Sequence, residues 1–327
     1  MKTDDFRSLI EAELIAFDQA LNNKRPLNLY TPIKYTIELG GKRFRPMLTL
    51  MGCLLFNGKP EEAIKAAVGI ELFHNFTLVH DDIMDKAPLR RNKPTVQKQW
   101  NQDIAILSGD ALFVQSVQYI MQSPSDKLKE VLEIFTQTAL EVCEGQQLDM
   151  DFEKQYNVTI PQYIKMIGLK TSVLLAGSLK IGAVIGGAGN NDAHHLYEFG
   201  KNLGIAFQLH DDILDVFGAS DKVGKQKGGD IVSNKKTYLF LKAIEVADRY
   251  SKEKLQMWMQ AGEENAAEKV ESVKTIYEFL NVKVIAEAEM RKYFEKALEH
   301  LNSIEHCNNE VKVQIREFAE NLMQRES

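Results

Sequence analysis

The distribution of proline constrains the fold of this chain more than any other sequence feature. All eight prolines of the 327 residues lie at or before Pro161. Proline breaks helices because it lacks an N–H and its ring clashes with the preceding turn. The proline-free remainder is rich in Ala, Leu, Glu, Lys and Gln, which favour helix. Apolar residues recur at helical spacing, for example over residues 128–135 and 282–293, and alternating strand patterns are lacking. The sequence therefore predicts an all-α chain.

Short breaks cut this helical pattern into segments of ordinary length. They occur at Asn57-Gly58, at Ser123-Pro124-Ser125, from Tyr156 to Pro161, and from Gly186 to Asn191. No linker rich in Ser, Gly or Pro divides the chain. We therefore predict a large single-domain helical bundle over residues 1–327, at the upper end of the size range for one core.

Composition and charge exclude several classes of protein. The net charge is −6, with 44% hydrophobic and 26% charged residues, which are globular values and exclude intrinsic disorder. The lack of a basic excess argues against a nucleic-acid partner. Cys53, Cys143 and Cys307 are far apart, so we expect no disulfide framework or cysteine zinc site, and a reducing compartment fits.

No segment predicts export or membrane insertion. The charged first seven residues lack the apolar core of a signal peptide. The weakly polar run over 173–189 contains Lys180 and several glycines, and it is too short for a convincing membrane span. We therefore expect a cytoplasmic protein without stable membrane insertion.

One acidic pattern occurs twice. Residues 78–85 and 208–215 each lead from an apolar run into His-Asp-Asp-Ile-x-Asp. Residues four apart share one face of a helix, so Asp81 lies with Asp85, and Asp211 with Asp215. The middle residues of the motifs, Asp82 and Asp212, point about 100° away.

Paired carboxylates are unfavourable unless a cation neutralises them. Oxygen ligands that fill only part of a coordination shell suit Mg²⁺, which keeps waters and accepts phosphate oxygens. A single motif is commonly a solvated acidic helix face. The repetition and the apolar flanks favour instead two motifs that face each other across a cavity and hold several Mg²⁺ ions around a polyanion.

Basic residues near these motifs are weak signals one by one. Lys42 and Arg45 lie three apart after Gly-Gly, a spacing that can aim two cations at one diphosphate, although a solvated turn is commoner. Arg90 and Arg91 are adjacent and could serve two phosphates. Five further candidates stand alone in the sequence, and an isolated residue of this kind usually belongs to the core or the surface. They are His74, Lys170, Thr171, Lys225 and Lys235.

Taken together, these residues resemble the trans-isoprenyl diphosphate synthases, the polyprenyl synthetase family. The resemblance runs in order from about Gly40 to Tyr238. The matching blocks are GGKRFRP (40–46), DDIMD (81–85), RRNKPT (90–95), SGDALF (108–113), GQQLD (145–149), LKT (169–171), FQLHDDILD (207–215) and GGDIVSNKKT (228–237). Asn92 and Asn234 stand where the family commonly has glycine, and we expect both to be tolerated because Asn adopts the left-handed conformation more readily than most residues.

The resemblance implies a helical bundle around a deep central cavity, normally a homodimer, and it assigns roles to residues of this chain. The implied ligands of three Mg²⁺ ions, with Mn²⁺ able to replace them, are Asp81, Asp85 and Asp211. The implied allylic-diphosphate contacts are Arg90, Lys170, Lys225 and Lys235, with Asp82 and Asp212 completing the catalytic motifs. The implied isopentenyl diphosphate site is Lys42, Arg45, His74 and Arg91, and Thr171 and Gln208 are the polar groups beside the cationic carbon.

The implied reaction joins isopentenyl diphosphate to an allylic diphosphate, such as the dimethylallyl, geranyl or farnesyl compound. In this family, bulky residues one or two turns before the first motif stop the growing tail. Phe76, its small neighbour Thr77, and Phe73 one turn further resemble the C20 geranylgeranyl type. A C15 farnesyl product and longer chains are the alternatives.

Other functions remain open from the sequence. A class I terpene cyclase usually has an Asn/Ser/Glu motif in place of the second aspartate motif, and squalene- or phytoene-type synthases use DxxxD. An HD-type phosphohydrolase would use His80-Asp81 and His210-Asp211, but it leaves Asp85 unexplained. A non-catalytic regulatory subunit usually loses one aspartate motif, whereas this chain keeps both.

Overall fold

A computed structural model describes residues 3–155, 157–218, 228–261 and 265–324. It is 79% helical. The first elements are α1 (Thr3–Leu21), α2 (Leu27–Glu38), α3 (Phe44–Leu55), α4 (Pro60–Met84), β1 (Leu89–Arg90), β2 (Lys93–Pro94), α5 (Val96–Gln99), α6 (Gln102–Ile120) and α7 (Leu128–Lys154). They are followed by α8 (Ile160–Ile167), η1 (Gly168–Ser172), α9 (Val173–Ile185), α10 (Asn190–Phe217), α11 (Gly229–Val232), α12 (Tyr238–Val246), α13 (Arg249–Trp258), α14 (Ala266–Phe279), α15 (Val282–Asn302) and α16 (Asn309–Met323).

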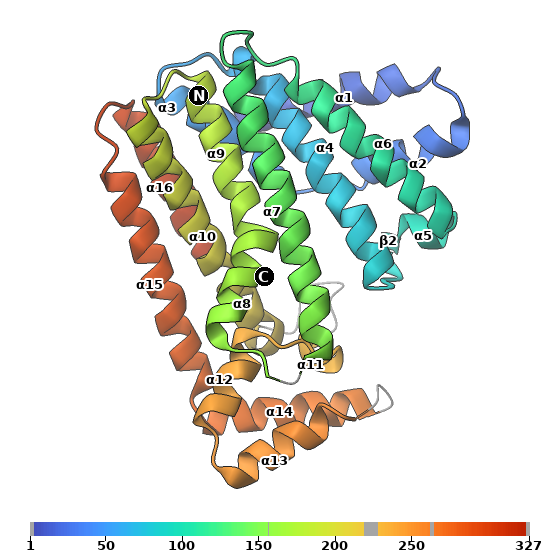
Figure 1. Ribbon diagram of the computed structural model, residues 1–327, viewed down its shortest axis with the longest axis vertical. Helices are drawn as coiled ribbons and strands as arrows, with labels where there is room; N and C mark the ends of the chain where they lie inside the picture. Colours follow the sequence, from blue (N-terminus) through green and yellow to red (C-terminus); the bar gives the residue numbers. More distant parts are fainter. Residues whose placement is uncertain (1–2, 156, 219–227, 262–264, 325–327) are drawn as a thin grey trace. The chain divides into compact units, whose positions relative to one another are not determined.

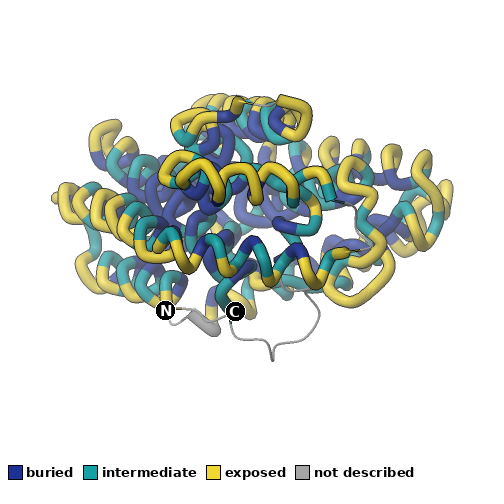
Figure 2. The backbone as a smooth tube through the Cα atoms, turned by 90° about the horizontal axis from the view of Figure 1, so that it is seen from below, coloured by how far each residue is buried: buried dark blue, intermediate teal, exposed yellow. Residues whose placement is uncertain are grey.

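The helical prediction is confirmed, and each predicted break lies at a junction between helices. Most helices alternate between buried and exposed positions, as amphipathic helices do (Figure 2). The one departure from an all-helical chain in the described residues is a two-stranded antiparallel hairpin, in which Leu89 pairs with Pro94 and Arg90 with Lys93. Strands of two residues carry no alternating pattern, so sequence periodicity could not predict them.

Contacts divide the chain into two compact units. The first unit comprises Met1–Gln137, Gly177–Tyr197 and Ile304–Lys312, and the second comprises Thr138–Ala176, Glu198–Ser303 and Val313–Ser327. Each unit therefore joins segments that are distant in the sequence. The prediction of one domain over residues 1–327 stays a prediction.

In the first unit, α4 is the central helix. It packs against α1, α3 and α6, and α6 also contacts α2 and α5 (Figure 1). All eight residues from Ala66 to Phe73 are buried, so this part of α4 is enclosed on every side, while partly exposed positions return toward its C-terminal end. Burial of this apolar surface fixes the orientation of α4 about its axis, and thereby the direction in which each residue of the first aspartate motif points.

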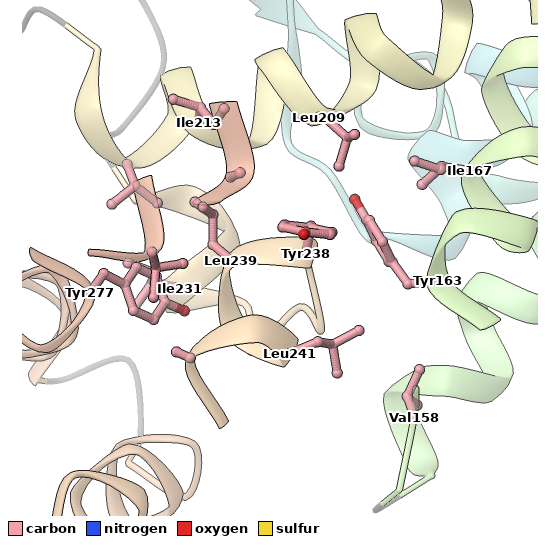
Figure 3. Packing of buried hydrophobic residues seen from close by; sticks show 14 of the residues in the cluster. Val158, Tyr163, Ile167, Leu209, Ile213, Ile231, Tyr238, Leu239, Leu241 and Tyr277 are labelled. Atoms are coloured by element: carbon pink, nitrogen blue, oxygen red, sulfur yellow. The ribbon is translucent and has the colours of Figure 1, made fainter. Parts of the chain in front are cut away.

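The second unit has its own hydrophobic core. Residues of α8, α10, α12, α14 and α15 contribute to it, including Tyr163, Leu209, Leu239 and Tyr277 (Figure 3). α12 contacts α8, α13, α14 and α15. The proline-free C-terminal sequence thus forms helices that support the segment around the second aspartate motif.

Residues Ile160–Ile185 form the single stretch of the described chain that is long and apolar enough to cross a membrane. However, 78% of its most apolar window is buried inside the protein. Such burial is typical of the core helix of a globular protein, and its apolar composition is explained by packing.

Candidate active site

The first half-site, in the first unit, is formed at the C-terminal end of α4. Asp85 caps this helix, and its backbone N–H donates to the carbonyl of Asp81 at 2.8 Å. The two aspartates are thus one helical turn apart. Asp81 is half-buried and Asp85 is exposed, whereas Asp82 between them is buried. The first motif therefore presents two carboxylates away from the core and directs the third into it.

The buried Asp82 carboxylate is paired with Arg90 of the hairpin. Arg90 Nε donates to the two oxygens of Asp82 at 3.0 and 2.9 Å, and Nη2 donates to Oδ1 at 2.8 Å. Burial raises the pKa of Asp82, and the Arg90 guanidinium opposes that rise. A planar guanidinium that donates through two of its nitrogens has both its position and its orientation fixed. Asp82 therefore orients Arg90.

The hairpin turn separates the two adjacent arginines. Arg91 and Asn92 form the turn and have φ values of 53° and 63°. Positive φ at both central positions is the geometry of tight hairpin turns, and Asn accepts it readily. Asn92 therefore has the left-handed conformation on which its expected tolerance rests. Arg90 reaches Asp82, whereas the guanidinium of Arg91 lies against Gly41.

The glycine-rich block before α3 places its cations in different surroundings. Lys42 is exposed, while Arg45 lies in the first turn of α3. Arg45 Nη1 is 3.1 Å from Nε2 of His74 on α4. Burial and then the nearby Arg45 hold the pKa of His74 well below its usual range. A neutral His74 ring can therefore accept a hydrogen bond from Arg45.

Arg43 has a role that the sequence analysis missed. It has φ of 52° and is buried, with Nη1 2.7 Å from Glu71 Oε1. It also donates to Glu11 at 3.1 Å and to the carbonyl of Ile37 at 3.2 Å. Arg43 thus anchors the segment that carries Lys42 and Arg45. The sequence did contain a signal for this contact: Glu71 is an acidic residue inside the apolar run of α4, and a buried Glu needs a partner.

An aromatic cluster lies before the first aspartate motif. Phe73 is fully buried, and its ring centroid lies 5.6 Å from that of Phe76. Phe113 of α6 is 5.3 Å from Phe76, and Phe135 of α7 is 5.5 Å from Phe73. Thr77 donates to the carbonyl of His74 on its own helix. Phe73 and Phe76 were predicted from the sequence, whereas Phe113 was not, although Phe113 ends the SGDALF block.

The second half-site, in the second unit, depends on an irregular helical turn. Residues Gly168–Ser172 form a π-helix, a conformation often found at functional sites. A Cβ at Gly145 would lie 2.2 Å from the backbone nitrogen of Lys170, and one at Gly204 would lie 2.6 Å from Cα of Ser172. Glycine at both positions therefore allows α7 and α10 to approach this turn closely.

This close approach produces a chain of side-chain contacts. Lys170 forms an ion pair with Asp149 of α7 at 2.5 Å. Thr171 Oγ1 donates to Gln208 Oε1 at 3.2 Å, and Gln208 Nε2 donates to Asp212 Oδ1 at 3.2 Å. Asp149 lies in the GQQLD block, to which the sequence analysis gave no role.

Asp212, like Asp82, is buried. Its Oδ2 accepts from the hydroxyl of Tyr163, and the backbone N–H of Tyr238 also donates to the carboxyl group. Burial and then the nearby Asp230 raise the pKa of Asp212 to about 8. Its partners are neutral donors, in contrast to the guanidinium that Asp82 holds.

The outer acids of the second motif differ from each other. Asp211 is half-buried on α10. Asp215 accepts from the backbone N–H of Asp230 at 3.1 Å, so it holds the start of α11. Asn234 follows α11 with φ of 56°, the left-handed conformation on which its expected tolerance rests. Lys225 lies outside the described residues.

One cavity of the second unit collects most of these groups. Its lining includes Lys170, Thr171, Gln208, Asp212 and Lys235. Lys236 donates to the carbonyls of Phe152 and Glu153 at the end of α7, which fixes the segment next to Lys235. The cavity therefore combines cations with the polar groups predicted to lie beside a reacting carbon.

The donor set fits Mg²⁺ bound together with a phosphate ligand. No group of three or more His, Cys, Asp or Glu among the described residues is close enough to hold a metal ion by itself. Asp81 and Asp85 offer hard oxygen atoms from one helical turn, which fill only part of an octahedral shell. Such a site requires additional oxygen ligands, and waters and substrate phosphates supply them to Mg²⁺.

These features define a class: all-α proteins with two copies of an aspartate motif, each accompanied by basic side chains. Residues 26–280 match the polyprenyl synthetase family, and this chain belongs to it. Membership of this family argues against the alternative of an HD-type phosphohydrolase. Consistently, His80 is 3.2 Å from the carbonyl of Ile106 and lies edge-on to Phe76.

Individual relatives agree with the family. The geranylgeranyl diphosphate synthase of Methanosarcina mazei is 39% identical over 70% of this chain and 72% of its own length. A crystal structure of a geranylgeranyl pyrophosphate synthase, 41% identical, superposes with a TM-score of 0.93 and covers 100% of both chains. The Corynebacterium glutamicum geranylgeranyl pyrophosphate synthase complexed with isoprenyl diphosphate and magnesium is 25% identical, with a TM-score of 0.91, and covers 99% of this chain and 100% of its own.

The buried ion pair of Arg43 generates a stability prediction. Glu71→Ala leaves a buried guanidinium with a weaker partner, since Glu11 is 42% exposed. Loss of one member of a buried pair costs about 3–5 kcal/mol. We expect a decrease of this size in the free energy of unfolding, measured by chemical denaturation. In the control, Glu253→Ala removes an exposed partner of Arg249 and should cost less than about 1 kcal/mol. Equal losses in the two variants would contradict the anchoring role.

Proposed function

We propose that this protein is a trans-prenyltransferase that condenses isopentenyl diphosphate with an allylic diphosphate and releases a C20 geranylgeranyl product. The observation that carries the proposal is the shared design of the two aspartate motifs. In each, the first acid is half-buried, while the middle acid is buried and hydrogen-bonded to a neighbouring side chain. The geranylgeranyl relatives support the proposed product.

Each site residue has a proposed role. Asp81, Asp85 and Asp211 are the proposed ligands of three Mg²⁺ ions, which Mn²⁺ can replace, and magnesium in the similar C. glutamicum complex supports this. Arg90, Lys170, Lys225 and Lys235 bind the allylic diphosphate, and Asp82 and Asp212 orient their neighbours. Lys42, Arg45, His74 and Arg91 bind isopentenyl diphosphate; the Arg45–His74 contact supports this group.

The proposed reaction begins with cleavage of the C–O bond of the allylic diphosphate. The electron pair leaves with the diphosphate, and the cations of Arg90, Lys170 and Lys235 stabilise its growing negative charge. Bound Mg²⁺ supplies additional stabilisation of that charge. The oxygen atoms of Thr171 and Gln208 lie beside the cationic carbon. The double bond of isopentenyl diphosphate attacks this carbon, and the released diphosphate accepts the proton that is then lost.

The same proposal extends to the domain organisation, the cellular location and the partners of this protein. We propose that residues 1–327 act as one polyprenyl synthetase domain in the cytoplasm, without a nucleic-acid partner and without stable insertion into a membrane. Both aspartate motifs are intact, which disfavours a regulatory subunit. Lys42 and Arg45 disfavour a terpene cyclase, which has no use for an isopentenyl diphosphate site.

Purified protein should condense isopentenyl diphosphate with dimethylallyl, geranyl or farnesyl diphosphate only when Mg²⁺ is present. Asp81→Ala and Asp211→Ala should each lower turnover about 100-fold or more, because each removes stabilisation of the leaving diphosphate. Products are identified by mass spectrometry.

Asp126→Ala is the matched control, because this side chain is 73% exposed and lies outside both motifs. It should retain wild-type turnover. No condensation with any of the three primers would overturn the proposed function. Near-wild-type rates for either motif variant would overturn the metal-site assignment and leave the function standing.

The aromatic cluster supports a limit on product length. Phe76 is half-buried and rests on the buried Phe73, so it can border the space into which the tail grows. Phe113 supports Phe76 from α6. Phe73 is fully buried and cannot move aside without disturbing the core, so it gives Phe76 a rigid support.

Phe76→Ala should therefore lengthen the products beyond C20 while Mg²⁺-dependent turnover continues. Phe17→Leu alters an aromatic pair with Tyr119 elsewhere in the same unit and should leave the product distribution unchanged. Product lengths are compared by mass spectrometry. An unchanged distribution in Phe76→Ala would show that other residues limit the chain, and a wild-type product of C15 or longer than C20 would contradict the C20 assignment.

An exposed apolar face of α6 supports a homodimer. Leu107 and Val114 of α6, and Met121 at its C-cap, follow one another at intervals of seven residues, and they are 60%, 55% and 55% exposed. Residues seven apart lie on one side of a helix. Exposed apolar patches of this kind mark interaction surfaces, and a second copy of this chain is the proposed partner.

Sedimentation measurements at micromolar concentration should therefore find a dimer. The double variant Leu107→Glu/Val114→Glu should be monomeric, because it places charges in an apolar interface. Val313→Glu, at an exposed apolar position on α16, should remain dimeric. A monomeric wild type, or a double variant that remains dimeric, would contradict this assignment.

A further inference from the structure

Tyr163 is a buried polar residue to which the proposed mechanism gives no role. It lies on α8, four residues after Thr159, which begins the helix with a capping box to Gln162. Its ring packs beside Ile167 and Leu209, and its hydroxyl oxygen points toward α10 (Figure 3). An apolar pocket could hold Phe at this position equally well. The hydroxyl therefore requires an explanation.

The hydroxyl of Tyr163 is the outer end of a continuous hydrogen-bond chain. It donates to Oδ2 of Asp212. The other oxygen, Oδ1, accepts from Gln208 Nε2 at 3.2 Å, and Gln208 Oε1 accepts from Thr171 Oγ1 at 3.2 Å. All four side chains line the same cavity. The chain thus connects a core tyrosine on α8 with the two polar groups assigned to the cationic carbon.

The direction of each hydrogen bond determines how Gln208 is oriented. An amide can present either its oxygen or its NH₂ group to a neighbour. The NH₂ group of Gln208 donates to Oδ1 of Asp212, which leaves the amide oxygen for Thr171. Thr171 uses its single hydroxyl hydrogen in that bond, so the lone pairs of its own oxygen remain available.

This orientation suits the charge that develops in the proposed reaction. A cationic carbon is stabilised by oxygen lone pairs and is destabilised by N–H or O–H groups that point at it. The advantage is lost when the amide or the hydroxyl rotates. Asp212 can hold Gln208 only while its own carboxyl group is fixed. The Tyr163 hydroxyl and the backbone N–H of Tyr238 are the donors that fix it.

We propose that Tyr163 is a positioning residue, which holds Asp212 so that Gln208 and Thr171 present oxygen lone pairs to the allylic carbon. This inference rests on the proposed function and deepens it. Tyr163 acts through Asp212 and Gln208. The first motif uses its middle acid in a parallel way, because Asp82 holds Arg90.

Tyr163→Phe removes the hydroxyl and keeps the ring. We expect kcat for Mg²⁺-dependent condensation to fall between about 10-fold and 100-fold, the range that a small misplacement of reacting groups can cost. The KM values for both substrates should change less than about twofold, because no diphosphate contact is altered. Tyr277→Phe is the control: Tyr277 is buried in the same core, lies near Asp212, and has no hydrogen bond to it among those described.

A double-mutant cycle separates positioning from a general structural role. If Tyr163 acts through Gln208, Tyr163→Phe should lower kcat by less than about twofold when Gln208→Ala is already present. Independent effects would multiply in the double variant, and that result would overturn the inference. Equal kcat values for Tyr163→Phe and Tyr277→Phe would overturn it as well.

Stability and wild-type activity complete the test. Tyr163→Phe and Tyr277→Phe should unfold at similar temperatures, and a much lower midpoint for Tyr163→Phe alone would assign the hydroxyl to stability and overturn the inference. A wild-type protein that is active while Tyr163→Phe is unimpaired overturns only the role of Tyr163. A wild-type protein that makes no product overturns the proposed function, and the inference with it.

Discussion

Buried carboxyl groups need partners, and the two half-sites are organised by this requirement. Asp82 and Asp212 lie where the helical period directs the middle residue of each motif into the protein. A carboxyl group removed from water is stable only with hydrogen bonds or an opposite charge. Asp82 meets this need with the Arg90 guanidinium, and Asp212 meets it with Tyr163, Gln208 and a backbone N–H. In both cases the buried acid fixes a side chain that the reaction is proposed to use.

The backbone at these sites is irregular in ways that serve the same end. Arg91 and Asn92 take the left-handed conformation, so the hairpin folds Lys93 back to pair with Arg90. The π-helical turn at Gly168–Ser172 carries Lys170 and Thr171. Gly145 and Gly204 let the neighbouring helices approach that turn. Regular helices supply the rigid support, and the irregular segments adjust where single side chains point.

The apolar parts of the molecule have a second proposed task besides stability. Phe73 belongs to the core of the first unit, while Phe76 and Phe113 continue the same aromatic cluster outward. A rigid cluster of this kind can support the unit and also limit the space for an isoprenoid tail. In the second unit, α12, α14 and α15 form a core around the segment from α11 to Lys235. The C-terminal helices, in which the sequence shows no chemistry, therefore provide this support.

The sequence by itself determined the all-α fold and the family. Proline placement and apolar spacing are local signals, and the two aspartate motifs with their basic blocks form a specific combination. Helical periodicity also indicated that Asp82 and Asp212 point away from the outer acids. The partners of these residues could not be predicted, because Arg43–Glu71, Lys170–Asp149 and Tyr163–Asp212 join segments far apart in the sequence. Phe113 and Phe135 were missed for the same reason, since their rings reach Phe76 and Phe73 from other helices. Only the packing of helices decides which distant side chains meet, and burial then decides which of those contacts must be satisfied.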